Sequence, residues 1–167
     1  MAAHMARGVV LIHSAPNALC PHLEWAVGRT LGRPVNFEWA EQPVLPGARR
    51  AEFYWEAPGG TGAALASAMH GWEHLRFEVT EDATPRSDGG RWMHTPDLGI
   101  HYAQIDSAGN VVVGEDRIRY AMEIAGFNAE ELRRELDVAL GSAWDEELEP
   151  FRHASDHVPV VWLHKVG

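Results

Sequence analysis

An internal repeat constrains the fold of this chain more than any other feature. Two apolar runs of equal length, residues 8–16 and 50–58, both end in Ala-Pro and are typical of strands. Two alternating segments, residues 35–41 and 75–81, share Phe-Glu at matching positions and end on glutamate. Since the two sets are offset by about 40 residues, we expect two related strand–helix–strand units.

Helix-compatible stretches connect the strands of each unit, at residues 17–31 and 61–72. Strand, helix and strand in succession, occurring twice, form the split βαβ pattern. The sequence therefore predicts an α+β fold, a ferredoxin-like βαββαβ sandwich over about residues 8–82, with both helices on one face of the sheet. In this arrangement the strands at 8–16 and 50–58 are expected to be parallel neighbours.

The remaining chain, residues 83–167, is predicted to extend the same sheet, because no linker-like stretch separates it from residues 8–82. The chain then forms a single domain, in which residues 1–7 are tag-derived or disordered. The predicted elaboration is a β-hairpin, two to three helices and a C-terminal strand. Strands are expected at 91–95, 98–106, 111–113 and 158–164, and helices at about 115–125, 128–141 and 142–150.

The net charge of the chain limits the classes of partner that it can bind. It has 14 basic and 24 acidic residues and a formal net charge of −10, and its longest basic cluster is a pair of arginines. Phosphate backbones repel so acidic a chain, so we expect no nucleic-acid partner. The sequence has neither an apolar stretch of about 18 residues nor the features of a signal peptide, which predicts a cytoplasmic protein that does not enter membranes.

A candidate ligand site follows from the predicted topology. If the two apolar strands are parallel, His13 and Ser14 emerge at the same rim of the sheet as Gly59, Gly60, Thr61 and Gly62. Both predicted helices begin at this rim, and helix N-termini favour anions such as phosphate or carboxylate. The alternative is that the Pro-Gly-Gly-Thr-Gly run is a tight strand-to-helix turn in which the threonine caps the helix.

Nucleophilic catalysis is a second interpretation of the same region. Cys20 is the only cysteine, which excludes an internal disulfide, and it precedes His22 near the start of a predicted helix. A thiol or hydroxyl beside a histidine base is a nucleophile pair, so His13 with Ser14 or Cys20 is the candidate combination. The alternative is that Cys20 is a small buried core residue.

Histidine pairs raise the question of a metal site. His70 and His74 are four residues apart, as are His153 and His157, but neither pair has an evident third and fourth ligand. We therefore expect neither a metal nor another cofactor. The acidic run at 145–149 is interpreted as a solvated helix face.

Four segments, taken together, connect the chain to a known family. They are residues 20–26 (CPHLEWA), 75–82 (LRFEVTED), 94–99 (HTPDLG) and 143–150 (AWDEELEP). Over nearly its whole length the chain resembles an actinobacterial family of uncharacterised proteins, a domain of unknown function. Family genes tend to lie beside fatty-acid synthesis genes, so the resemblance implies a role near acyl carrier protein, acyl-CoA or the carboxylase that makes malonyl-CoA. It assigns no catalytic residue.

Three functions stay open. Seven tryptophans and the lack of a catalytic motif favour a non-enzymatic accessory or regulatory protein that binds a protein partner or forms a homo-oligomer. The second function is a small-molecule sensor that binds an acyl-CoA, a phosphate or a carboxylate at residues 58–62. The third is an enzyme that uses His13 with Ser14 or Cys20.

Overall fold

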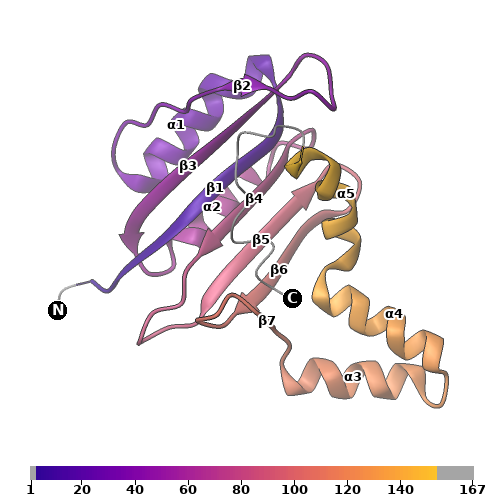
Figure 1. The fold of residues 1–167 in the computed structure, drawn as a ribbon. Coiled ribbons are helices and arrows are strands. Elements are labelled where there is room, and N and C mark those ends of the chain that lie inside the picture. Colours follow the sequence, from indigo (N-terminus) through magenta and orange to yellow (C-terminus); the bar gives the residue numbers. More distant parts are fainter. Residues whose placement is uncertain (1–2, 154–167) are drawn as a thin grey trace.

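The computed structural model describes residues 3–153. Within this range the chain forms a seven-stranded antiparallel sheet, in the order β2-β3-β1-β4-β5-β6-β7, and five α-helices, so the predicted α+β class is confirmed (Figure 1). The strands are β1 (Met5–Pro16), β2 (Ala40–Glu41), β3 (Ala48–Pro58), β4 (Arg76–Glu81), β5 (Gly89–Thr95), β6 (Gly99–Ile105) and β7 (Val111–Val112). The helices are α1 (Cys20–Leu31), which follows the 3-10 turn η1 (Asn17–Leu19), α2 (Thr61–Met69), α3 (Glu115–Ala125), α4 (Ala129–Leu140) and α5 (Ser142–Arg152).

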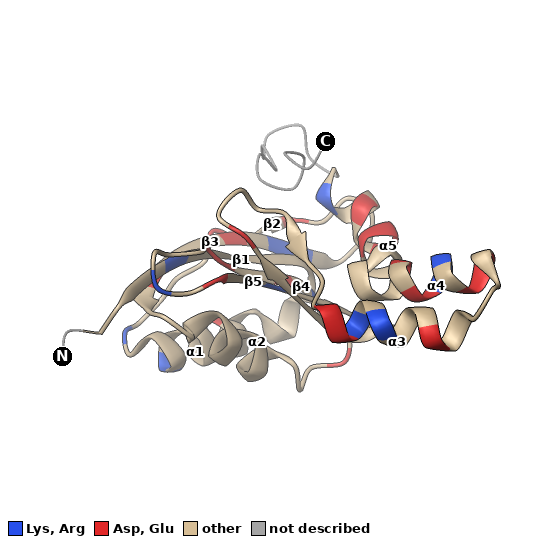
Figure 2. Cartoon of the chain, turned by 90° about the horizontal axis from the view of Figure 1, so that it is seen from below, with Lys and Arg blue, Asp and Glu red and all other residues tan. Residues whose placement is uncertain are grey.

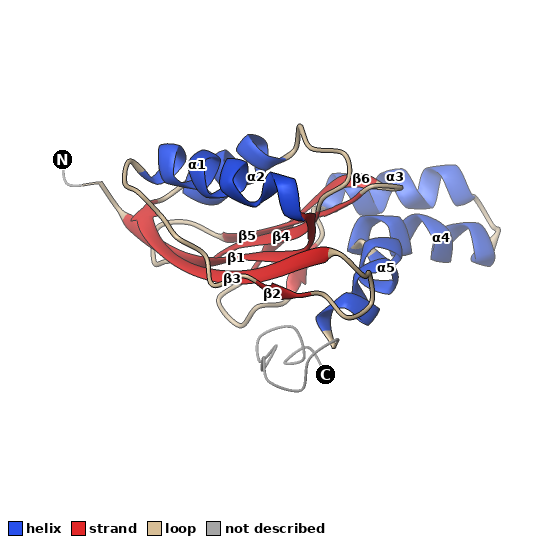
Figure 3. Cartoon of the chain, turned by 90° about the horizontal axis from the view of Figure 1, so that it is seen from above, coloured by secondary structure: helices blue, strands red, loops and turns tan. Residues whose placement is uncertain are grey.

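Helices α1 and α2 cover one face of the sheet and bury the main hydrophobic core (Figure 3). Leu23 and Val27 lie four residues apart on α1, as do Leu65 and Met69 on α2, and all four are fully buried. Four-residue spacing places side chains on one side of a helix, so each helix presents its apolar stripe to the sheet. Phe77 of β4 is fully buried in the same core.

Strands β1 and β3 are neighbours in the sheet, but they run antiparallel. Met5 pairs with Pro58 and Pro16 pairs with Ala48, so the end of β1 lies beside the start of β3. The predicted parallel arrangement is therefore wrong. The predicted order of elements itself requires this result, because the crossover through α1 makes β2 run parallel to β1, and the reversal between β2 and β3 then makes β3 antiparallel to β1. Strand β1 also begins at Met5, three residues before the predicted start.

The strand predicted at 35–41 is reduced to the two residues of β2. Glu24 of α1 explains the difference, because its Oε1 accepts hydrogen bonds from the backbone N–H of Phe37 and the indole Nε1 of Trp39, both at 2.9 Å. The backbone N–H of Phe37 therefore bonds to α1 and is not available for pairing with a neighbouring strand. The Phe37 ring lies 5.1 Å from that of Phe53 on β3.

Helices α3 and α4 form a hairpin that projects beyond β7, and α5 lies on the face opposite α1 and α2 (Figures 1 and 3). The predicted end of the last helix at Pro150 is wrong, since α5 continues to Arg152 with Pro150 inside it. Its N-cap is Gly141, not the predicted Ser142. Among residues 3–153 no helix has the length and apolarity needed to span a membrane. The strand predicted at 158–164 lies outside the described residues.

Candidate functional site

The glycine-rich turn that we expected to bind an anion is occupied by a carboxylate of the protein itself. Glu81, at the end of β4, accepts hydrogen bonds from the backbone N–H groups of Gly60 at 2.8 Å and Gly62 at 2.7 Å. The hydroxyl of Thr61 donates to the carbonyl of Pro58 at 2.6 Å. Glu81 is buried, and it satisfies N–H groups at the start of α2, where the helix carries partial positive charge.

The other predicted ligand residues, His13 and Ser14, lie near the opposite end of β1. The backbone N–H of Gly59 donates to the carbonyl of His4 at 2.7 Å, just before β1 begins. Nine residues of extended strand, roughly 30 Å, separate His4 from His13. The prediction that both segments share one rim is therefore wrong, because it required β1 and β3 to be parallel. A ligand-binding role for either segment stays a prediction.

His13 belongs instead to a buried ionic cluster around Glu78 of β4. The Glu78 side chain has no exposed surface, and its Oε2 lies 2.5 Å from Nε2 of His13 and 3.0 Å from Nε of Arg152. Its Oε1 accepts from Nη2 of Arg152 at 2.6 Å and from Nη2 of Arg91 at 3.0 Å. Asp145 of α5 bridges the same two arginines, at 2.7 and 2.9 Å. We call these five residues the Glu78 cluster.

The Glu78 cluster fixes α5 to the sheet. Burial alone raises the pKa of the Glu78 carboxyl, but the hydrogen bond and charge of His13, together with the charges of Arg152 and Arg91, outweigh it and hold this pKa well below its usual range. Burial likewise lowers the pKa of Arg152, and the charge of Glu78 reverses the effect, so the net pKa is raised. Both groups are therefore charged at neutral pH.

Cys20 lies in a structural environment and not in that of an activated nucleophile. It is 7% exposed, and its Sγ donates to the carbonyl of Pro16 at 3.8 Å. Burial raises the pKa of the thiol, an effect that the charge of Arg49 only partly opposes. Reactive cysteines need a lowered pKa, so the alternative of a buried core residue describes Cys20 better. His22 is exposed on the same helix.

No group of three or more potential metal ligands occurs among residues 3–153. His70 and His74 do not form a chelating pair on one helix, because α2 ends at Met69. The His70 ring instead packs edge-on against His94 at 5.9 Å, and Nδ1 of His94 donates to a backbone carbonyl at 2.6 Å. His153 contacts Glu149 at 2.6 Å, and His157 lies outside the described residues.

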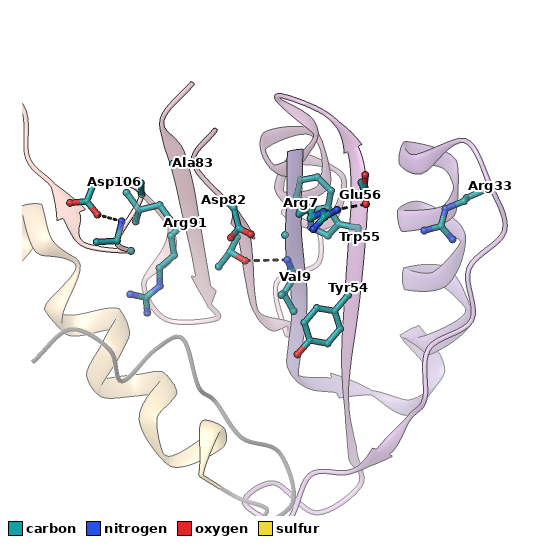
Figure 4. Close-up of a pocket in the computed structure, with 16 residues that line it drawn as sticks. Arg7, Val9, Arg33, Tyr54, Trp55, Glu56, Asp82, Ala83, Arg91 and Asp106 are labelled. Carbon is teal, nitrogen blue, oxygen red and sulfur yellow. Dashed lines mark hydrogen bonds and ion pairs between the residues drawn. The ribbon is translucent and has the colours of Figure 1, made fainter. Parts of the chain in front are cut away.

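The face of the sheet opposite α1 and α2 carries a hollow of about 880 Å³ (Figure 4). Arg7 and Glu56 form an ion pair of 3.2 Å on one side of it, and Arg91 lies on the other side. Its floor includes Val9, whose N–H donates to the hydroxyl of Thr80 at 3.1 Å. The hollow has the size of a small-molecule pocket. Three arginines and three carboxylates line it, so it has no excess charge of one sign that would select a ligand of the other sign.

The α3–α4 hairpin carries an apolar surface that sequence patterns did not identify. We call residues 114–141 the arm. Tyr120, Ile124 and Phe127 follow one another at spacings of four and three residues and are 47%, 50% and 111% exposed. In α4, all of which the structure describes, no residue is buried. The signal available in the sequence was the pair Tyr120 and Ile124, one turn apart on α3, with Phe127 in the turn that follows the helix. Periodicity predicts the Ile118–Met122–Ala125 stripe as the packed face, but Met122 is 60% exposed.

Acidic and basic residues both occur along the helices of the arm, whereas α5 carries four acidic residues before Arg152 at its end (Figure 2). The buried cluster and the arm are joined by α5, which carries both Asp145 and Arg152. At its start, the indole Nε1 of Trp144 donates to the carbonyl of Gly99 on β6 at 2.9 Å, and its ring lies 4.7 Å from that of His101. The base of the arm is therefore attached to the sheet by specific contacts.

Comparisons with known proteins identify a family but no characterised relative. A family model described as Protein of unknown function (DUF3145) matches residues 9–165. No curated protein and no solved structure matches the chain. Because the family model spans nearly all of the sequence, this chain belongs to the DUF3145 family of proteins of unknown function.

Proposed function

We propose that this protein is a non-enzymatic accessory protein that acts through protein–protein interaction, and that the arm is its interaction element. The observation that carries the proposal is the group of exposed apolar side chains at the tip of the arm, Tyr120 and Ile124 on α3 and Phe127 in the turn between α3 and α4. Large exposed apolar groups that lie together on one face typically mark a surface that another molecule covers. Aromatic side chains are also common energetic centres of protein interfaces.

The candidate catalytic groups bind to other parts of the protein, which supports this proposal over the proposal of an enzyme. His13 contacts Glu78, and the Cys20 thiol donates to a backbone carbonyl and has a raised pKa. Ser14 is buried and its Oγ accepts a hydrogen bond from Arg76 at 3.3 Å. A nucleophile needs a base within hydrogen-bond reach, and these groups have other partners.

The proposal also includes the cellular location, the source and the metabolic pathway of the protein. We propose a cytoplasmic protein of actinobacterial origin that is linked to fatty-acid or acyl-CoA metabolism, in accordance with the resemblance in its sequence. Acyl carrier protein and acyl-CoA carboxylase subunits are the first partners to test.

A photo-crosslinking amino acid at position 127 tests the interaction in living host cells. We expect it to crosslink a defined protein, and we expect Ile124→Ser in the same chain to reduce that crosslink at least tenfold. The control carries the crosslinker at Tyr54, which is 67% exposed on the sheet and lies outside the arm. A yield at position 127 no higher than at position 54 would refute the arm as the interaction element.

A further inference from the structure

The hollow on the sheet face opposite α1 and α2 is a groove that crosses the strands. Tyr54 of β3 pairs with Val9 of β1, which pairs with Thr80 of β4. Thr80 in turn pairs with Arg91 of β5, and Ile105 of β6 also lines the hollow. Residues paired across strands stand side by side on one face of a sheet, and Figure 4 shows Tyr54 and Arg91 on either side of Val9. Neighbouring strands are about 4.8 Å apart, so the groove runs roughly 19 Å from β3 to β6.

The lining of the groove suits an apolar occupant without net charge. Val9 and Thr80, on its floor, have small side chains, whereas Tyr54 at one end is 67% exposed. Because three arginines and three carboxylates line the groove, it attracts neither sign of charge over the other. A segment of apolar side chains can therefore enter it without leaving a charge of its own unpaired.

Helix α5 ends beside this groove. Arg152, in its last turn, contacts Glu78, and Thr80 on the groove floor follows Glu78 by two residues on the same face of β4, roughly 7 Å away. Arg91 contacts Glu78 at 3.0 Å and also lines the groove. The structure describes the chain as far as residue 153, so the following residues start from this point. Residues 154–157 can span about 13 Å when extended, which is enough to reach either end of the groove.

The sequence that follows has the composition and the length that the groove requires. Residues 158–163 (VPVVWL) are all apolar, and residues 157–164 include no aspartate, glutamate, lysine or arginine. The run 158–164, which the sequence predicts to be a strand, spans roughly 23 Å when extended, close to the length of the groove. The family model extends to residue 165 and therefore includes this run in the same domain as the sheet.

We infer that residues 158–164 lie extended across the groove and cover this face of the sheet. The occupant is a segment of the same chain, because it starts next to the groove, matches it in length and carries no acidic or basic residue that the balanced lining would leave unpaired. The inference goes beyond the proposed function and does not depend on the arm, which projects beyond β7 (Figure 1). A ligand or a partner protein would then reach Val9 or Thr80 only after displacing this segment.

A photo-crosslinking amino acid in place of Val161, at the centre of the run, tests this placement in the purified full chain. At 1 μM we expect crosslinks within one chain, and mass spectrometry should map them to residues that line the groove, at least ten times as often as to the rest of the chain. The matched control carries the crosslinker in place of Ala64, which is exposed on α2, on the other face of the sheet. Crosslinks from position 64 should not reach the groove.

Thiol reactivity at the same position gives a second readout. In a Cys20→Ser background, Val161→Cys should react with Ellman's reagent at least tenfold more slowly in buffer than in 6 M urea. Tyr54→Asp in that chain should raise the rate in buffer at least threefold, because it places a charge against apolar side chains at the end of the groove. Trp25→Asp should leave the rate unchanged, since Trp25 is 63% exposed on α1, outside the groove.

Crosslinks from position 161 that fall mainly on α1 and α2, on the arm, on an edge of the sheet or on a second chain would overturn the inference. Equal thiol reactivity in buffer and in urea would overturn it as well. Either result leaves the proposed function standing, because that function is tested at position 127. Conversely, a failed crosslink at position 127 refutes the role of the arm and leaves the placement of residues 158–164 standing.

Discussion

Replacing Glu78 by glutamine tests whether the buried cluster is essential to the fold. The substitution preserves the shape of the side chain but removes the charge that faces His13, Arg91 and Arg152. Arg152 is 3% exposed, so its guanidinium loses its main counterion where water cannot replace it. Removing one partner of a buried ion pair costs about 3–5 kcal/mol. Because Asp145 still contacts Arg152 at 2.9 Å, we expect a loss of about 3 kcal/mol for Glu78→Gln.

Urea unfolding followed by tryptophan fluorescence measures this loss, and pH gives a second readout. The pKa of Glu78 lies well below its ordinary value of 4.5 in the folded protein, so the unfolded chain binds more protons as the pH falls toward and below 4.5. The stabilisation is therefore complete above this pH and is lost on acidification. In the glutamine variant this acid-dependent loss should disappear, which flattens the decline in stability below about pH 5.

The control is Arg7→Met, which removes an ion pair whose side chains are 75% and 53% exposed. Exposed pairs contribute little, so we expect a change within about 0.5 kcal/mol. The reasoning fails if Glu78→Gln costs less than about 1 kcal/mol, or if its unfolding free energy declines with acid as steeply as that of the wild type.

Three further predictions concern the turn before α2 and the cysteine. Glu81→Gln should lower the unfolding free energy by about 1–2 kcal/mol, because an amide cannot accept hydrogen bonds from both backbone N–H groups equally well. Thermal or urea denaturation measures this loss, and an unchanged midpoint would contradict the capping role of Glu81. Gly62→Ala should cost about 1–3 kcal/mol, since its Cβ would lie 2.7 Å from the Trp92 ring, whereas Gly71→Ala, with nothing within 4 Å, should be nearly neutral. Cys20 should react with Ellman's reagent at pH 7.5 at least tenfold more slowly than in 6 M urea, and equal rates would show that the thiol is accessible.

Local patterns predicted most of the elements but not how they are arranged. The runs that became β1, β3 and β4 are apolar enough to be recognised, and four-residue spacing identified α1 and α2. Strand direction follows from the order of the elements, because the α1 crossover leaves β2 parallel to β1 and the turn before β3 reverses the chain; the parallel expectation did not follow from the predicted pattern. The contact of Glu24 with Phe37 is a true limit of local patterns, because a carboxylate on a helix prevents pairing 13 residues further along.

The candidate site shows why distant partners are hard to predict. Glu78 stands between Phe77 and Val79 in an alternating strand, a pattern typical of a polar side chain that faces water. It is buried because Arg152, 74 residues later, lies over it. Glu81 likewise resembles the polar end of a strand, although it caps a helix that began 20 residues earlier. Neither pairing leaves a local signal in the sequence.

The position of α5 has a mechanical consequence. One end of this helix is tied to the sheet margin through Trp144, and the other is tied to β4 and β5 through Arg152, Glu78 and their neighbours. An 11-residue helix is roughly 16 Å long, so α5 is a short, rigid element that is held at both ends. The arm joins α5 directly at Gly141, with no flexible loop between them, so the charged contacts of α5 resist a displacement of the arm. Weakening those contacts would let the arm swing without unfolding its own helices.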